Sequence, residues 1–218
     1  MTELRAPRES SSDVAAAILA GGGGRRLSPR KPLLDVGGVA VIERVLASVR
    51  TLGIEPFLIT NTPDDYDHLG LRATPDVRPG LGPLGGILTA LRVTGAERVL
   101  VVAADLPFLR PQLLRRLVER AGEGDCIVAE WDHRIQPLHG VYGASCDAPI
   151  QRMVDADELC PLDLYPLIST VLVSEAEIAA LDPEGLSFFN INTPEDLEEA
   201  RRMATALARE AEVAGSCD

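Results

Sequence analysis

The sequence has no long apolar run and few cysteines. No stretch approaches the roughly 20 apolar residues of a membrane-spanning helix, and the first residues are polar and carry both signs of charge, unlike a secretory signal. The 4 cysteines are scattered without a C-x-x-C pair, and only 3 histidines could join them, so no zinc ligand set is visible. We therefore expect a cytoplasmic protein without a membrane partner, whose cysteines are free thiols.

Basic residues are outnumbered, and lysine is nearly absent. The chain has 33 acidic and 21 basic residues and a formal net charge of −12. General nucleic-acid binding and binding to anionic membranes depend on a cationic surface, so this balance argues against both. Lys31 is the only lysine, and all the other counted basic residues are arginine. Residues 14–34 contain no acid, which favours a local site for a polyanion such as a triphosphate.

The length and the hydrophobic pattern predict one α/β domain. Short apolar runs alternate with segments of helical period over the 218 residues, as in a Rossmann-like, mostly parallel twisted sheet with helices on both faces. We expect strands over 14–20, 57–60, 99–104 and 126–131, and helices over 39–52, 84–93, 111–121 and 194–211. The domain should span residues 13–211, between disordered tails at 1–12 and 212–218.

A glycine-rich turn follows the first predicted strand. Residues 21–31 fit neither a Walker A loop nor a dinucleotide-binding fingerprint. Backbone N–H groups of such a turn can approach a phosphate closely, and a compact ammonium suits a phosphate as a point charge. Four cationic side chains lie in this segment: Arg25, Arg26, Arg30 and Lys31. The pattern favours phosphate binding; the alternative is a solvated turn that contains a lysine.

Two further segments are candidates for the same edge of the sheet. Asp105 ends the strand predicted over 99–104, so its carboxylate should lie on the side of the glycine turn. Mg²⁺ takes one or two carboxylates plus substrate phosphates, which makes Asp105 a candidate ligand; the alternative is a turn before Pro107. The Gly- and Pro-rich residues 74–86 precede a helix. Either their backbone amides bind the edge of a nucleotide base, or the segment is only a rigid surface loop.

Together these motifs resemble one family. They comprise Leu19-Ala20-Gly21-Gly22, Arg26, Lys31, Pro75-Asp76, Gly82-Pro83-Leu84-Gly85-Gly86, Asp105-Leu106-Pro107, Gln136-Pro137-Leu138-His139 and Asn190-Ile191-Asn192-Thr193-Pro194. Over residues 14 to about 200, the chain is similar to the molybdenum cofactor guanylyltransferases, the MobA family of the nucleotide-diphospho-sugar transferase-like superfamily. The L-A-G-G form is typical of this family, whereas the related cytidylyltransferases read L-A-A-G.

The resemblance implies a fold of the glycosyltransferase-A-like type, an activity and a set of site residues. The family transfers GMP from GTP to the terminal phosphate of molybdopterin and releases pyrophosphate. The implied GTP-binding residues are Leu19, Ala20, Gly21, Gly22, Lys31, Asp76, Gly82, Gly85 and Asp105. The implied catalytic residues are Lys31, Arg26 and Asp105, with Asp105 also the ligand of Mg²⁺. Contact with molybdoenzyme maturation factors is implied as well.

Several residues have more than one interpretation, and two other functions are compatible with the sequence. Asn61 is a further candidate nucleotide contact, while Asn190 and Asn192 either flank the cofactor site or serve as turn and capping residues. We interpret His139 as structural and Trp131 as a residue at the edge of the core, rather than as pterin contacts. The other functions are transfer from CTP or another NTP to a different phosphate acceptor, and non-catalytic regulation by a bound nucleotide.

Overall fold

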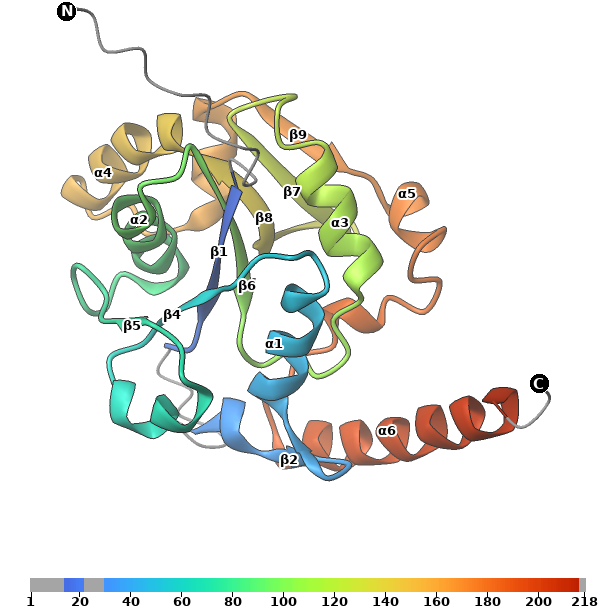
Figure 1. Cartoon of the computed structure of the whole chain (residues 1–218). Coiled ribbons are helices and arrows are strands. Elements are labelled where there is room, and N and C mark those ends of the chain that lie inside the picture. The colour runs from blue at the N-terminus through green and yellow to red at the C-terminus, as the bar shows by residue number, and fades with distance from the viewer. Residues whose placement is uncertain (1–13, 22–29, 216–218) are drawn as a thin grey trace, which may run out of the picture.

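The computed structural model describes residues 14–21 and 30–215 as a layered α/β fold. The strands are β1 Val14–Leu19, β2 Asp35–Val36, β3 Val39–Ala40, β4 Phe57–Ile59, β5 Ala73–Thr74, β6 Arg98–Ala103, β7 Cys126–Trp131, β8 Arg134–Gly143 and β9 Thr170–Val173. Seven of them form one sheet in the order β5-β4-β1-β6-β8-β7-β9, and β2 and β3 form a separate hairpin (Figure 1). In the large sheet, neighbours are parallel except where β8 pairs with β6 and β7.

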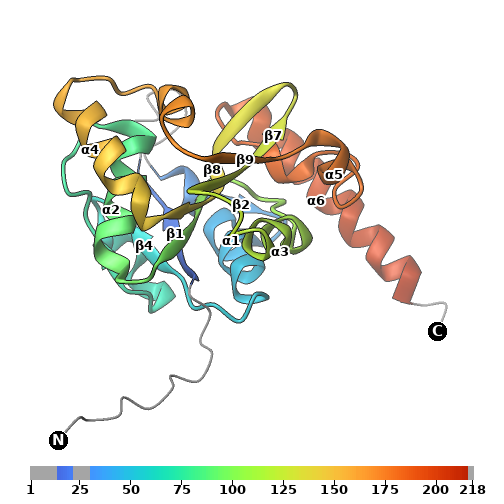
Figure 2. The same ribbon diagram turned by 90° about the horizontal axis from the view of Figure 1, so that it is seen from above.

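Helices cover both faces of this sheet, as Figures 1 and 2 show from two directions. The α-helices are α1 Val41–Arg50, α2 Gly82–Thr94, α3 Pro111–Glu119, α4 Asp147–Asp155, α5 Glu175–Ala179 and α6 Pro194–Gly215. Short 3₁₀ helices are η1 Lys31–Leu33, η2 Pro63–Leu69, η3 Ala144–Cys146, η4 Pro161–Leu167 and η5 Leu186–Phe188. Helices α1 and α3 share one hydrophobic cluster, and α2 and α4 share a second on the opposite face. The predicted mostly parallel sheet with helices on both faces is confirmed.

The central strand β6 is buried on both of its faces. Leu100 and Val102 contact the cluster of α1 and α3, whereas Val99 and Val101 contact the cluster of α2 and α4. All four side chains are fully buried. A strand covered on both sides has no reason to alternate polar and apolar residues, and this explains the continuous apolar run in the sequence.

The helix predicted over 39–52 begins at Val41 instead. Gly37 and Gly38 have φ angles of +66° and +82°, the backbone of a tight hairpin turn that glycine adopts at little steric cost. This turn joins β2 to β3, and Val39 belongs to β3. Val39 is 39% exposed, so the predicted inclusion of this residue in the helix is wrong.

The antiparallel strand β8 is absent from the sequence prediction. The two residues between β7 and β8, Asp132 and His133, have φ angles of +52° and +57°. Such a pair forms a two-residue hairpin turn, but neither residue is glycine, so the sequence gives only a weak turn signal. In the sheet, β8 places His139 beside Val102 of β6.

The last helix, α6, starts at Pro194 as predicted but continues to Gly215. Residues 212–215 of the predicted C-terminal tail are therefore helical, while the predicted tail at 1–12 lies outside the described residues. Ala200 and Ala204 bury the inner side of the helix in a third hydrophobic cluster with Phe108. Beyond this contact, α6 extends away from the body of the molecule (Figures 1 and 2). Within the described ranges, no helix is both long and apolar enough to cross a membrane.

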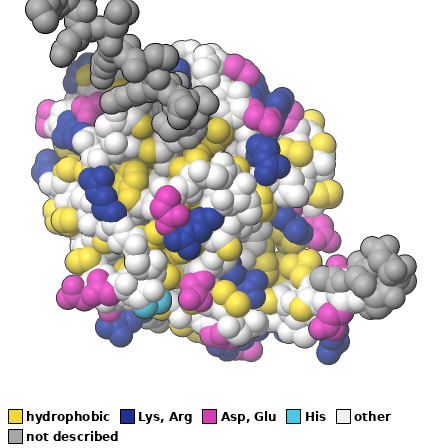
Figure 3. Space-filling view, in the orientation of Figure 1, with side chains coloured by type: hydrophobic (Ala, Val, Ile, Leu, Met, Phe, Trp, Pro, Cys, Tyr) yellow, Lys and Arg dark blue, Asp and Glu magenta, His cyan; other side chains and the backbone are white. Residues whose placement is uncertain are grey.

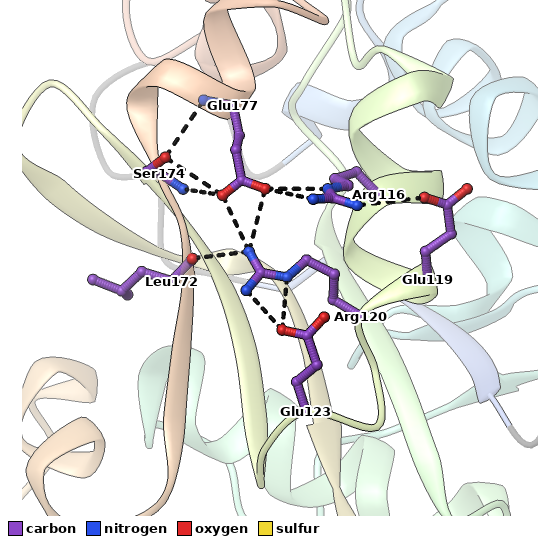
Figure 4. Close-up of polar contacts among 7 residues, drawn as sticks. All are labelled: Arg116, Glu119, Arg120, Glu123, Leu172, Ser174 and Glu177. Carbon is purple, nitrogen blue, oxygen red and sulfur yellow. Dashed lines mark hydrogen bonds and ion pairs between the residues drawn. The ribbon is translucent and has the colours of Figure 1, made fainter.

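An ion-pair network joins α3 to α5 (Figure 4). The Glu177 carboxylate lies 2.7 Å from the guanidinium of Arg116 and 3.1 Å from that of Arg120. Hydrogen bonding from Arg116 is the largest cause that lowers the pKa of Glu177. Ser174 caps the same helix by accepting a hydrogen bond from the Glu177 N–H. The network fixes the short α5, which has few buried residues of its own.

Candidate active site

The carboxyl ends of the parallel strands bring the predicted site residues to one edge of the sheet. The chain leaves β1 at Gly21, β4 at Asn61, β5 at Asp76 and β6 at Asp105. Backbone hydrogen bonds extend the pairing past the strand ends, from the Ala20 N–H to Ile59 and from the Ala104 N–H to Leu19. In open α/β sheets, this edge is where ligands bind, at the point where successive strands are added on opposite sides.

A cavity of about 380 Å³ opens at this edge. Its lining residues are Leu19, Gly21, Ile59, Asn61, Asp76, Gly80, Gly82, Pro83, Gly86 and Leu138. The structure thus places four of the predicted nucleotide-binding residues together, namely Leu19, Gly21, Asp76 and Gly82. The candidate Asn61 joins them.

Asn61 and Asp76 form a reciprocal pair at the cavity wall. The Asn61 Nδ2 donates to Asp76 Oδ2 at 2.9 Å, and the Asp76 N–H donates to Asn61 Oδ1 at 3.1 Å. Burial raises the pKa of Asp76, and the hydrogen bond from Asn61 partly opposes this effect. The β-carbon of any larger residue at position 21 would lie 3.7 Å from Asp76 Oδ2. Gly21 therefore keeps the space beside this carboxylate clear.

Helix α2 lies close against β1 at Gly86, and its Gly85 lies close to Leu81 just before the helix. A β-carbon at Gly86 would lie 2.5 Å from Leu19 Cδ1, and one at Gly85 would lie 2.7 Å from the Leu81 Cβ. Gly85 is not among the cavity-lining residues; it is buried and leaves room for the side chain of Leu81. Ala20 does not line the cavity either. The Thr89 hydroxyl accepts from the Val77 N–H and so holds the preceding loop on α2.

A second part of the site contains Lys31 and Asp105. Burial raises the pKa of Asp105, and the nearby ammonium of Lys31 is the largest opposing influence. The Lys31 Nζ donates to Asn192 Oδ1 at 3.0 Å. The Ile191 N–H donates to the Asp105 carbonyl, so the segment before α6 lies directly beside both charged residues. Gly22 and Arg26, which the sequence also assigns to this site, lie outside the described residues.

Asp105 fits a metal that takes few protein ligands. In the part of the chain that the structure describes, no group of three or more His, Cys, Asp or Glu residues could enclose a metal ion. A half-buried carboxylate beside a lysine instead matches Mg²⁺, which is typically held by one or two carboxylates and the phosphate oxygens of a substrate. The donor chemistry is therefore compatible with Mg²⁺ on Asp105 when a polyphosphate is bound.

A larger open cleft of about 1080 Å³ lies between the β7–β8 hairpin and α6. Trp131 lines it, but the indole is held between other groups of the protein. Its ring stacks on Phe188 at 5.3 Å, and a β-carbon at Gly185 would lie 2.2 Å from it. His139 is buried and bonds to the Ser187 carbonyl at 2.8 Å. These contacts support the interpretation of both residues as structural.

The family model of the MobA-like NTP transferase domain matches residues 16–162, which include the cavity residues, Lys31 and Asp105 but not Asn192. The chain belongs to the MobA-like NTP transferase family. The resemblance to this family is thus confirmed, and the chain is a nucleotidyltransferase by family.

Relatives of this family cover most of the chain. A probable molybdenum cofactor guanylyltransferase of Pelotomaculum thermopropionicum is 39% identical over 180 residues, covering 83% of this chain and 88% of that protein. A molybdenum cofactor guanylyltransferase of Desulfosudis oleivorans is 31% identical over 164 residues, covering 75% and 81%. Molybdopterin-guanine dinucleotide biosynthesis protein A of Archaeoglobus fulgidus, a solved structure, has a TM-score of 0.75 at 28% identity and covers 88% of this chain and 99% of that one.

Proposed function

We propose that this protein transfers GMP from GTP to the terminal phosphate of molybdopterin, which releases pyrophosphate and forms the guanine dinucleotide cofactor. The observation that carries the proposal is the Asn61–Asp76 pair in a cavity beside Gly21. A carboxylate accepts hydrogen bonds only, and guanine presents two neighbouring N–H donors on its Watson–Crick edge. The names of the relatives agree with a guanine nucleotide as substrate.

The triphosphate would extend from this cavity toward Lys31 and Asp105. The Lys31 ammonium would neutralise charge on the phosphate oxygens and hold them for in-line attack on the α-phosphorus. Arg26 would contribute to the same neutralisation. Asp105 would hold Mg²⁺, which when bound supplies further positive charge to the phosphates. Ala20 and Gly22 would contribute backbone groups next to the nucleotide.

The acceptor phosphate must reach the α-phosphorus from the side opposite the leaving pyrophosphate. Asn190 and Asn192 lie on the segment that touches Lys31 and Asp105, so we place the acceptor along this segment. Transfer between two phosphates needs positioning and charge neutralisation more than a general base, and the site is built from such groups. Contact with molybdoenzyme maturation factors stays a prediction.

Product analysis tests this proposal. Purified protein is incubated with Mg²⁺, molybdopterin and either GTP or CTP, and the products are identified by mass spectrometry. We expect the guanine dinucleotide and pyrophosphate with GTP, and little product with CTP. A cytosine dinucleotide as the main product would favour the other nucleotide. GTP binding without any product would favour a regulator.

A further inference from the structure

The segment 182–192 connects a buried polar cluster to the site. It leads from the end of α5 through η5 to Asn192, the residue that accepts a hydrogen bond from Lys31. Asp182 is only 1% exposed and Ser187 is fully buried, and such complete burial is unusual for polar side chains. Buried polar groups of this kind fix a backbone when all of their hydrogen bonds are made.

The Asp182 carboxylate caps the start of η5. Its Oδ1 accepts from the Leu186 N–H at 3.1 Å, and its Oδ2 accepts from the Ser187 N–H at 2.7 Å. The guanidinium of Arg110, at the start of α3, lies 3.8 Å from the same carboxylate. Both oxygens are thus used on backbone donors, and an amide in place of the carboxylate would present its NH₂ group to one of them.

Ser187 is bonded through three groups to three different parts of the fold. Its N–H donates to the Asp182 carboxylate, and its hydroxyl accepts from the Arg110 N–H at 3.0 Å. Its carbonyl oxygen lies 2.8 Å from the Nε2 of His139 in β8. The next residue, Phe188, packs against the rings of both His139 and Trp131. Ser187 is therefore the fixed point of the segment.

Ser187 lies five residues before Asn192, which contacts Lys31. Between Ser187 and Asn192, the fully buried Ile191 and its hydrogen bond to the Asp105 carbonyl hold the chain against the end of β6. The Asp196 carboxylate then accepts from the N–H groups of Asn192 and Thr193 at 2.8 Å each. The position of Asn192 is thus set from both sides, by Ser187 before it and by α6 after it.

We propose that Asp182 and Ser187 are positioning residues of the active site: through the backbone of 187–192, they hold Asn192 against Lys31 and so determine where the Lys31 ammonium lies. The consequence for catalysis rests on the proposed function. The consequence for the Lys31–Asn192 contact does not, because that contact is present in the protein without any substrate.

The test uses the fact that Lys31 is the only lysine. The full chain and its variants are treated with an amine-directed reagent, and peptide mapping separates the Lys31 label from the label on the N-terminal amine. Asp182→Asn and the milder Ser187→Ala are compared with Asn192→Ala, which removes the contact directly. Glu177→Gln is the matched control, because it also converts an acid to an amide and weakens the attachment of α5, yet the hydrogen bonds and ion pairs of Glu177 go to Arg116, Arg120 and Ser174 rather than to residues 182–192.

We expect Asp182→Asn and Ser187→Ala to increase the labelling rate of Lys31 about threefold or more, the factor that corresponds to losing one ordinary hydrogen bond, and to approach the rate of Asn192→Ala. Glu177→Gln should label as the unchanged protein does. In turnover, the first two variants should lower kcat while the KM for GTP stays within about twofold.

Thermal unfolding separates positioning from general stability. If Asp182→Asn and Ser187→Ala lower Tm as Glu177→Gln does but leave the labelling rate of Lys31 unchanged, the cluster only stabilises the fold and the proposal is wrong. If Lys31 labelling rises but no guanylyl transfer is found in the unchanged protein, the positioning stands and the proposed function fails.

Discussion

At the scale of single residues, Asp105 has the environment of a residue used for charge rather than for packing. Burial raises the pKa of its carboxyl group, so in the folded protein the ionised form is less stable than it is in the unfolded chain. Folding stability therefore decreases as pH rises through the pKa of this group. A protein retains such a cost where the charge serves a ligand.

Asp105→Asn should abolish turnover without harming the fold. The amide keeps the shape of the side chain and removes both the cost of burying a charge and the anionic oxygen for Mg²⁺. We expect pyrophosphate release to fall about 100-fold or more, with Tm unchanged or raised. The exposed Asp163→Asn on η4 is the control and should keep full activity. Normal turnover by Asp105→Asn would remove this residue from the mechanism.

His139 makes stability depend on pH in a defined window. Burial lowers its pKa to about 4, and the carbonyl of Ser187, which only accepts, requires that the neutral ring carry its proton on Nε2. Because the unfolded chain titrates near 6.5, stability is complete above that pH and is lost as pH falls toward 4, by on the order of 3 kcal/mol in total.

The variant His139→Gln should remove this dependence. Glutamine can still donate to the Ser187 carbonyl but does not titrate. The slope of unfolding free energy against pH between 4 and 6.5 should therefore be smaller than in the unchanged protein, by the amount that corresponds to one proton taken up on unfolding. Denaturant unfolding at several pH values measures both slopes. Identical slopes would mean that His139 is already protonated in the folded protein or does not titrate in this window.

At the scale of secondary-structure elements, the site depends on how closely α2 approaches β1. Gly86 allows this approach because a β-carbon there would meet the side chain of Leu19, which also forms a wall of the nucleotide cavity. Because the atom that it would meet is the end of a flexible side chain, Leu19 can relieve such a contact by rotating. Rotation moves its methyl groups within a tightly packed wall, so the cavity must change shape.

Gly86→Ala should therefore weaken GTP binding more than it weakens the fold. The added methyl displaces Leu19, while the higher helix propensity of alanine offsets part of the strain by up to ~1 kcal/mol. We expect the Kd for GTP in calorimetry to rise at least about fivefold, which is ~1 kcal/mol. Gly122→Ala is the control, since a β-carbon there meets no atom within 4 Å. Unchanged GTP affinity in Gly86→Ala would show that Leu19 does not contact the nucleotide.

Elements with a strong local pattern were predictable, and those fixed by turns without glycine or by distant contacts were not. The buried run of β6 and the Pro194 start of α6 follow from local residue types. The start of α1 was misplaced because helical spacing continues into the hairpin made by Gly37 and Gly38. Strand β8 was missed because its turn uses Asp132 and His133 in place of glycine.

At the scale of the whole molecule, the site joins parts of the chain that are far apart in sequence. Local motifs predicted Gly21, Asp76 and Asp105 as site residues, but no local pattern relates Lys31 to Asn192 across 161 positions. The buried cluster around Asp182 was missed for the same reason, since it is completed by two distant residues, Arg110 just before α3 and His139 of β8. The face seen in Figure 3 carries basic and acidic side chains side by side.

In the proposed complex, guanine occupies the cavity of Asp76 while the phosphates lie on Lys31. Protection of Lys31 from amine labelling by a bound nucleotide tests both placements at once. Protein with Mg²⁺ is labelled at increasing concentrations of GTP or of CTP, and the label at Lys31 is quantified by mass spectrometry. We predict protection by both nucleotides at saturation, with half-protection at a GTP concentration at least about fivefold below that of CTP. Equal labelling of Lys31 with and without saturating GTP would contradict the placement of the phosphates, and equal protection by the two nucleotides would contradict the placement of guanine.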